Sequence, residues 1–486
     1  MSTRAQEQAE LSRWHLRPGI ADGSSFVALI ENEFAAPEAI LARQDRRLAE
    51  ILAFACKHVP FYRARFGALG LQPTDIRGLH ELPRLPVLSK HEVIEHCDQL
   101  RAEALPQGGQ IFGWFHSSGT TGRPVRVLMT RRSNLMYSIL AHRSRRWARI
   151  DPMGVLCSIK IPSHFARKNG ELLRDGELSR AERWDYLGSF FETGPAYGFN
   201  VWNPIARQLA WLREIQPNYL ATYSSTLEEL AYANDCAKPA DSISALFTAG
   251  LSTAPSTRRQ VERIYRAPLH DGYGLNEIGH VAVRCEAGLY HTHTEHCIVE
   301  VVDAQGQACV AGQLGRVLVT ALQNLAMPLI RYDTGDVARA ANLPCPCGRN
   351  LPVLGEIAGR FRRFGYLPEG TRARHFTLLD AIEAMPVELL KPLRQYQLHQ
   401  FRDRSFELRV RSAGGMPPDF SARLAQVWAG IAGAEQTPLR IVEVDAIQPS
   451  PSGKQLEFDS DFYPDPEAEI DPRVYRAAVE CLAQQD

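Results

Sequence analysis

The sequence predicts an α/β protein built from a large N-terminal domain and a small α+β C-terminal domain. Two observations carry this prediction. Short apolar strands alternate with helical stretches from about residue 110 to 285, and this alternation is typical of a mostly parallel sheet covered by helices. The pattern then changes to strand-rich near 298, and it changes again near Gly359. We therefore expect domains at 1–358 and 359–486, the first containing a β-rich subdomain.

Within the alternating region, Asn218–Tyr223 is predicted to be a strand. The segment Ser225–Glu228 has the spacing of a capping box, which favours a helix starting there. A second short strand is predicted at Ser244–Thr248, followed by Ala249-Gly250. Ligands of parallel sheets bind beyond the carboxyl ends of strands, so we expect functional residues at such ends.

Later segments predict strands in antiparallel pairs. Ile298–Asp303 and Gly315–Thr320 flank Gln305-Gly306-Gln307, a turn-forming tripeptide, and are expected to form a hairpin-like piece. In the C-terminal domain we expect a hairpin formed by Tyr396–Phe401 and Ser405–Arg411. A helix at Phe420–Ile431 and a further strand at Leu439–Val444 should follow it. This order indicates a separate small unit.

Composition excludes several classes of protein. The formal net charge is +0 and the pI is about 7.2, which argues against a protein that coats nucleic acid. Residues 1–19 lack the apolar run of a signal peptide, and no stretch reaches the roughly 18 apolar residues of a membrane span. The 10 cysteines are scattered along the chain, so we expect reduced thiols and a cytoplasmic protein without a membrane partner.

One loop indicates phosphate binding. Ser117-Ser118-Gly119-Thr120-Thr121-Gly122 combines hydroxyl side chains with two glycines, so backbone N–H groups and hydroxyls can approach a phosphate closely. The G-x-x-x-x-G-K-[ST] pattern of common nucleotide hydrolases is absent from the sequence. The loop therefore favours ATP used to activate another molecule.

Three further motifs carry suitable chemistry. Tyr273-Gly274-Leu275-Asn276-Glu277 offers a ring that can stack on a base and a carboxylate that can bind Mg²⁺. In Arg331–Asp336, an aspartate after a glycine turn can accept both hydroxyls of a ribose. Lys454, in Pro449–Lys454, can supply a cation to developing negative charge. Taken singly, Tyr273–Glu277 is better explained as a strand end with a turn, Arg331–Asp336 fits an ordinary turn, and a lone lysine is usually just solvated.

Taken together and in this order, the motifs resemble the superfamily of adenylate-forming enzymes, in particular phenylacetate–CoA ligases. The resemblance begins near His58–Arg63 and continues through Gly359-Arg360 to Gly453-Lys454. It implies activation of a carboxylic acid by ATP to acyl-AMP with release of pyrophosphate. The small domain then rotates, and the acyl group passes to a second nucleophile, usually the thiol of CoA.

The resemblance also implies roles for individual residues. The Ser117–Gly122 loop, with Thr121 among the catalytic residues, would hold the pyrophosphate end of ATP. Glu277 would bind Mg²⁺, and Lys454 would bridge the substrate carboxylate and the α-phosphate. The adenine would lie against a wall formed by Ala249, Gly250, Tyr273 and Gly274, with Asn276 beside them. The ribose hydroxyls would be held by Asp336 and Arg360.

Four residues in the region 285–347 predict a metal site. Cys345 and Cys347 form a C-x-C pair, and Cys285 and His291 lie upstream. Such nitrogen and sulfur ligands suit a tetrahedral structural Zn²⁺, although free thiols in a loop fit the same pattern. Related cysteine-bearing ligases carry zinc, which supports the metal. His293 and His296 compete with His291, which we prefer from its place before the Ile298-Val299-Glu300 strand in similar sequences.

Other residues bear on the substrate and the acceptor. Tyr197, Gly198 and Phe199 belong to an aromatic segment that the resemblance places along the acyl pocket, which favours an aryl or arylacetic acid. Ordinary core packing explains the same segment equally well. At the hinge, Arg362 and Arg363 stand where the family has aspartates, and the loop 365–370 also departs from the family pattern. These differences weaken the case for CoA as the acceptor.

Three hypotheses follow from the sequence. The first is an acid–CoA ligase acting through an acyl-adenylate, with ATP, Mg²⁺ and CoA as cofactors and a structural Zn²⁺. The second is an adenylating enzyme that delivers its acyl group to an amine or a carrier-protein thiol. The third is a silent nucleotide-binding scaffold, which the presence of Lys454, Glu277 and Asp336 disfavours. A homodimer would be in keeping with similar ligases.

Overall fold

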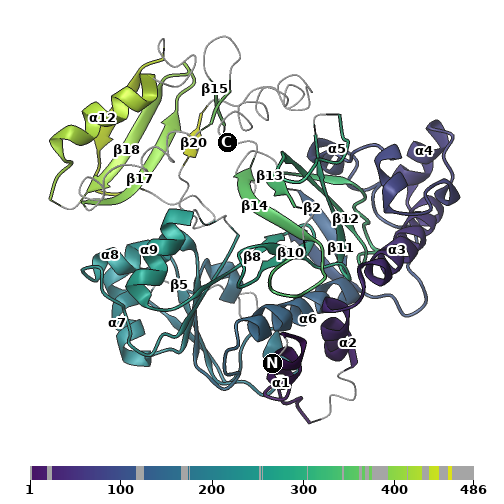
Figure 1. Cartoon of the computed structure of the whole chain (residues 1–486), viewed down its shortest axis with the longest axis horizontal. Coiled ribbons are helices and arrows are strands. Elements are labelled where there is room, and N and C mark those ends of the chain that lie inside the picture. The colour runs from purple at the N-terminus through teal and green to yellow at the C-terminus, as the bar shows by residue number, and fades with distance from the viewer. Residues whose placement is uncertain are drawn as a thin grey trace.

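The computed structural model of the chain describes most of the large domain and the core of the C-terminal unit (Figure 1). The described residues are 3–18, 24–116, 125–165, 173–174, 176–250, 253, 255–303, 305–341, 344–360, 364–366, 372–374, 392–412, 414–429, 437–447 and 458–461. Within these ranges, no helix combines the length and the apolar character needed to cross a membrane.

A twelve-stranded sheet runs through the large domain, in the order β11-β12-β13-β14-β10-β9-β8-β7-β6-β3-β5-β4. One half is parallel: neighbours from β8 through β5 all run in the same direction. Its strands are β3 (Leu156–Lys160), β5 (Ala196–Asn200), β6 (Tyr219–Thr222), β7 (Ala245–Ala249) and β8 (Leu269–Leu275), with β4 (Leu178–Ala181) antiparallel at the edge. The strands predicted at 218–223 and 244–248 are thus confirmed.

Helices cover both faces of this parallel half because its strands alternate two sets of apolar side chains. Leu220 and Leu246 join a core under α7 (Ile205–Ile215), α8 (Ser224–Ala233) and α9 (Pro255–Tyr265). Their neighbours Ala221 and Phe247 join the opposite core, under α6 (Arg131–Trp147).

The capping box predicted at Ser225–Glu228 is wrong. Helix α8 begins one residue earlier, at Ser224, and its N-cap residue is Tyr223, which makes no side-chain cap hydrogen bond. Strand β6 ends at Thr222, so the chain turns directly from strand to helix and Ser225 lies inside the first turn.

The other half of the sheet is antiparallel. It comprises β9 (Gly279–Arg284), β10 (Tyr290–Thr292), β11 (Cys297–Val302), β12 (Leu314–Ala321), β13 (Tyr332–Ala340) and β14 (Val353–Arg360). The pair predicted at 298–303 and 315–320 is confirmed as β11 and β12, which pair from Cys297↔Ala321 to Val302↔Arg316. The long helix α3 (Pro37–His58) and α4 (Pro60–Ala68) contribute to the largest core, together with residues of β11, β12 and β13.

The hydroxyl-rich loop follows the end of a strand, but that strand does not belong to the parallel sheet. β1 (Ile111–His116) and β2 (Arg126–Thr130) form a separate two-stranded antiparallel sheet. The loop 117–122 therefore connects a hairpin and does not follow a strand of the parallel sheet. The loop itself lies outside the described residues.

The C-terminal unit has its own sheet and its own core. Its strand order is β19-β18-β17-β20, with α12 (Pro418–Ala429) packed against it through Phe420 and Leu424. The predicted hairpin, helix and strand correspond to β17 (Leu393–Gln400), β18 (Phe406–Ser412), α12 and β19 (Leu439–Glu443), and β20 (Phe458–Ser460) completes the sheet. A domain boundary at 359 stays a prediction.

Shorter elements complete the described chain. The remaining helices are α1 (Thr3–Leu11), α2 (Ser24–Glu33) and α5 (Lys90–Glu95). Four 3₁₀ turns span Pro73–Asp75, Leu79–Arg84, Pro162–Phe165 and Leu187–Ser189, and a small hairpin joins β15 (Phe364–Tyr366) to β16 (Arg372–Arg374).

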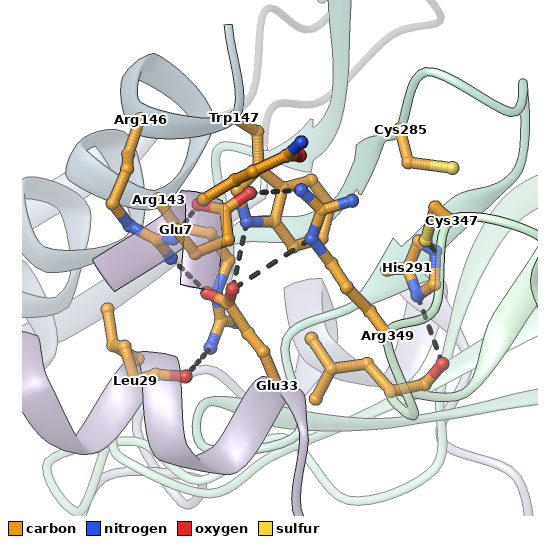
Figure 2. Close-up of polar contacts among 12 residues, drawn as sticks. Glu7, Leu29, Glu33, Arg143, Arg146, Trp147, Cys285, His291, Cys347 and Arg349 are labelled. Carbon is orange, nitrogen blue, oxygen red and sulfur yellow. Dashed lines mark hydrogen bonds and ion pairs between the residues drawn. The ribbon is translucent and has the colours of Figure 1, made fainter. Parts of the chain in front are cut away.

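A buried ionic network ties the N-terminal helices to α6 (Figure 2). The side chain of Glu33 is fully buried, and its Oε1 accepts a hydrogen bond of 2.9 Å from Arg143 Nε. Its other oxygen accepts from Trp147 Nε1 at 3.0 Å, and Arg146 pairs with both Glu33 and Glu7. Charges this deeply buried persist only when each is paired and hydrogen-bonded.

We predict that Glu33→Gln lowers the free energy of unfolding of the large domain by about 3–5 kcal/mol, because it leaves buried guanidinium groups without a compensating charge. Urea titration followed by tryptophan fluorescence measures this loss. Glu31→Gln, on the exposed side of the same helix, is the matched control and should change the value little. Equal stability of the two variants would contradict the role of the network.

Candidate functional site

Tyr273 and Asp336 are brought together from distant parts of the sheet. Tyr273 lies near the end of β8, and its Oη donates a hydrogen bond of 2.7 Å to Asp336 Oδ2 on β13. Both side chains are buried. Three strands separate β13 from β8, which would place them about 19 Å apart in a flat sheet. The contact therefore requires the sheet to curve strongly between its two halves.

The local backbone fixes the direction of Asp336. Gly335 has φ +73°, a left-handed conformation that glycine adopts without strain, and the Asp336 amide donates to Thr334 Oγ1 at 3.0 Å. Asp336 pairs in register with Arg360 of β14. The main chain of Arg360 is thus next to Asp336, while its side chain lies outside the described residues.

Glu277 and Asn276 form the turn between β8 and β9. Glu277 is buried, and its Oε1 accepts a hydrogen bond of 3.3 Å from Tyr332 Oη. Asn276 Nδ2 donates to the main-chain oxygen of His116 at 3.1 Å. His116 is the last residue of β1, so this bond fixes the base of the Ser117–Gly122 loop beside Glu277.

The predicted adenine wall occupies neighbouring strands. Ala249 ends β7 and pairs in register with Gly272, directly before Tyr273 and Gly274. Gly250 follows with φ +89° and is exposed. A Cβ at Gly274 would lie 2.9 Å from the main-chain oxygen of Gly279, so this close approach of two strands requires glycine.

Lys454 and the six residues Ser117 to Gly122, Thr121 among them, lie outside the described residues. The structure therefore brings together Tyr273, Gly274, Asn276, Glu277 and Asp336, and it leaves the loop and the lysine untested.

Two of the predicted pocket residues face the protein interior. Phe199 is fully buried beneath α7 and packs 4.8 Å from Trp211, measured between ring centroids. Gly198 faces the opposite side of β5, where a Cβ would lie 2.4 Å from the ring of Phe165. Tyr197 packs partly against the same core as Phe199. This placement favours the core-packing interpretation of the segment.

The four residues of the predicted metal site meet in one place. The ligating atoms of Cys285, His291, Cys345 and Cys347 all lie within 4.8 Å of one another, and all four side chains are buried. Cys285 Sγ is 3.6 Å from Cys345 Sγ, and Cys347 Sγ is 3.3 Å from His291 Nε2. His291 Nδ1 lies 3.1 Å from the main-chain oxygen of Leu351, to which it can donate its proton. That tautomer leaves Nε2 free to bind a metal.

The competing histidines have other partners. His293 Nδ1 lies 2.9 Å from Arg143 Nη1, which can only donate, so this ring nitrogen is an acceptor. His296 Nε2 lies 2.7 Å from the main-chain oxygen of Ile278. Neither histidine belongs to the cysteine cluster among the described residues.

Sequence reasoning missed Tyr332 and Arg349. Tyr332 lies in the predicted Arg331–Asp336 motif but had no assigned role, and it holds Glu277. Arg349 follows the C-x-C pair and lies between Cys347 and the Glu7–Glu33 network (Figure 2). Its place two residues after Cys347 is the signal that could have identified it.

Comparison with known proteins places this geometry in a class. No family model matches the chain. The fold is similar to 2-hydroxyisobutyryl-CoA ligase in the postadenylation state, with a TM-score of 0.68 and 20% identity over 94% of each chain. It is also similar to the anthranilate CoA ligase AuaEII, with a TM-score of 0.51 and 13% identity over 77% of this chain and 67% of that one. The chain thus has the fold of adenylate-forming ligases.

Sequence comparison narrows the class. The chain is 29% identical to the phenylacetate-coenzyme A ligase of Thermus thermophilus, over 66% of this chain and 71% of that protein. It is 28% identical to the phenylacetate-coenzyme A ligase of Escherichia coli, over 68% of this chain and 72% of that protein. The chain is thus similar in sequence to phenylacetate-coenzyme A ligases, in agreement with the resemblance drawn from the motifs.

We predict that Tyr273→Phe destabilises the large domain by about 1.5–3 kcal/mol, since the buried carboxylate of Asp336 loses a donor. Differential scanning calorimetry would detect a lower unfolding temperature. Tyr186→Phe is the control, because the Tyr186 side chain is 54% exposed. An unchanged midpoint for Tyr273→Phe would show that the hydroxyl does not hold Asp336.

Proposed function

We propose that the protein activates a carboxylic acid with ATP and Mg²⁺, forming acyl-AMP and pyrophosphate, and then transfers the acyl group to the thiol of CoA. The observation that carries the proposal is the convergence of Tyr273, Glu277 and Asp336 at the base of the Ser117–Gly122 loop. The relatives named phenylacetate-coenzyme A ligases, and the solved CoA ligases with acyl-adenylates, support the same reaction.

The geometry suits the first half-reaction. A carboxylate is a weak nucleophile that the negative polyphosphate repels, so the site must fix both reactants in line and offset the charge that builds on the α-phosphate. Asp336 and Tyr273 would fix the nucleoside, and the loop would hold the departing pyrophosphate. Glu277 would hold Mg²⁺, whose charge offsets that of the phosphates. Lys454 would contribute a second cation at the reacting oxygen atoms.

The second half-reaction exchanges one acyl bond for another. The thiolate of CoA attacks the carbonyl carbon of acyl-AMP, and AMP leaves with the electron pair of the broken C–O bond. The alternative acceptor, an amine or a carrier-protein thiol, is favoured by Arg362 and Arg363 at the hinge and by the divergent loop 365–370. Residues 361–363 and 367–370 lie outside the described residues.

We expect ATP–pyrophosphate exchange that depends on a carboxylic acid, with aryl and arylacetic acids as the first substrates to test. Lys454→Ala should lower exchange by roughly 10²–10³-fold while ATP still binds, because the variant lacks a cation required in the transition state. Lys57→Ala, at an exposed lysine on α3, is the control. Unchanged exchange in Lys454→Ala would contradict the mechanism.

Product analysis with and without CoA separates the acceptors. The proposal predicts an acyl-CoA thioester when CoA is present and enzyme-bound acyl-AMP when it is absent. If acyl-AMP forms and no thioester appears, the acceptor is an amine or a carrier protein.

We further propose a structural Zn²⁺ held by Cys285, His291, Cys345 and Cys347. Thiolates around a tetrahedral zinc, each about 2.3 Å from the metal, lie about 3.8 Å apart, close to the 3.6 Å between Cys285 and Cys345. Four protein ligands leave no open position, so the metal would fix the loop without taking part in catalysis.

The zinc proposal predicts close to one zinc per chain by mass spectrometry of the purified protein. Cys347→Ser should lose most of the metal and unfold at a lower temperature, since binding free energy contributes to folding. Cys236→Ser, which changes an exposed cysteine, should retain it. Metal-free wild-type protein would refute the site.

A further inference from the structure

A cluster of charged and aromatic side chains lies between α6 and the parallel strands, and none of the motifs includes it. We call it the Arg145 cluster. At its centre, the guanidinium group of Arg145 lies over the Phe247 ring on β7, with 3.5 Å between the guanidinium carbon and the ring centroid. His270 on β8 stacks on Phe247, with 5.2 Å between the two ring centroids. The members are Tyr137, Arg145, Lys160, Asp185, Tyr186, Phe247, His270 and His280.

The cluster reaches the proposed catalytic residues through Tyr137. The Tyr137 ring lies 5.1 Å from His280, between ring centroids, and a Cβ at Gly279 would be 3.1 Å from it. Burial raises the pKa of Tyr137, and the nearby Tyr186 and Glu277 raise it further, so the ring is within electrostatic reach of Glu277. Lys160 is the last residue of β3, at the carboxyl edge of the parallel strands where ligands bind.

A strained turn supports a role in binding. Tyr186 has φ 59° and ψ −58°, and the Leu187 amide donates to the main-chain oxygen of Asp185 at 2.6 Å. This is the rare γ-turn with positive φ, which non-glycine residues adopt only at a cost in free energy. Strain of this kind concentrates at ligand-binding sites. Here it places Tyr186 over Tyr137, with ring centroids 6.1 Å apart.

The charges of the cluster are unbalanced. Arg145 and Lys160 are half-buried, and among the described residues neither makes an ion pair. Burial, then Arg145, lowers the pKa of Lys160 to about 8, so it is mostly protonated at pH 7. Burial lowers the pKa of His270 to about 4 and that of His280 to about 3, so both imidazoles are neutral. Arg145 and Lys160 therefore bring two positive charges to the cluster, and the carboxylate of Asp185 lies near Lys160.

The spacing of residues along α6 gives the distance between the two ends of the cluster, Tyr137 and Arg145. Arg145 follows Tyr137 by eight residues, which is about 12 Å along the helix axis. Tyr137 lies near Glu277, and the Phe247 ring lies against Arg145. An acid that places its reacting carboxylate near Glu277 would thus need a ring in the middle and a negative group at its far end.

We propose that the Arg145 cluster binds the acyl part of the substrate, and that this substrate is an aromatic acid with a second carboxylate, held by Arg145 and Lys160. The inference rests on the proposed acid activation and adds the substrate class. Removing a cation from such a site leaves the second carboxylate of the substrate desolvated and without a partner. The loss of activity should therefore be much larger for acids that carry this carboxylate than for acids that lack it.

The test compares matched acids in the pyrophosphate-exchange assay: phenylacetate against 4-carboxyphenylacetate, and benzoate against terephthalate. Wild-type protein should prefer the dianion of a pair at least tenfold in kcat/KM. Arg145→Met, which keeps the packing volume on Phe247, should lower kcat/KM for the dianion by about 100-fold and leave the monoacid within about threefold. Lys160→Met should act in the same direction, and Arg46→Met, at an exposed arginine on α3, should have no effect.

The outcomes separate the inference from the proposed function. If the monoacids are activated and the dianions are not preferred, the inference is wrong and the proposed function stands. Equal losses for both acids in Arg145→Met, with an unchanged thermal midpoint, would also overturn the inference. Exchange with none of these four acids would overturn the inference, whereas exchange with no carboxylic acid of any class would overturn the proposed function as well.

Discussion

The buried carboxylate of Glu33 is the constraint on which the arrangement of the N-terminal helices, α6 and the cysteine-bearing loop depends. Three arginines from two segments surround it: Arg143 and Arg146 from α6, and Arg349 from the loop after Cys347. The Asn350 amide also donates to the main-chain oxygen of Glu33 at 2.8 Å. An ion in the interior admits few arrangements of its partners, because each misplaced donor costs free energy of desolvation. The end of α2 thereby sets the position of both segments.

This constraint has consequences for both proposed sites. Arg145 lies between Arg143 and Arg146, so the ionic network on one face of α6 fixes the rotation of the helix that presents Arg145 and Tyr137 on another. Arg349 does the same for the cysteines. It contacts Glu7 and Glu33 inside and Glu286, beside Cys285, at the surface. A zinc ion at the cluster and the ion pairs of Arg349 would then stabilise one loop from two sides.

Sequence patterns predicted the features that are determined by residues close together in the sequence. The pair β11 and β12 and the C-terminal β17–β18–α12–β19 order follow from local periodicity, and the C-x-C pair already contains half of the cysteine cluster. The prediction of a capping box was wrong because α8 begins directly after β6, one residue before the predicted start. The Glu33 network and the Tyr273–Asp336 contact could not be predicted, since their members are 63 to over 100 residues apart and no local pattern links them. Phe199 resembles a pocket residue in sequence, yet its face of β5 points into the core.

In the proposed function, the two halves of the sheet would bind different parts of the reactants. The parallel half ends at the edge where Lys160, Ala249 and Tyr273 lie, and its helix α6 would determine which acid fits. The antiparallel half curves back so that Asp336 meets Tyr273, and it would fix the nucleoside. If the proposed assignment holds, changes on α6 would alter acid selection without moving Asp336 or Glu277, whose side chains are held by Tyr273 and Tyr332. On the proposed assignment, the charge at the far end of the acyl site would be independent of the groups that bind ATP, so the choice of acid and the binding of the nucleotide would be set by different elements.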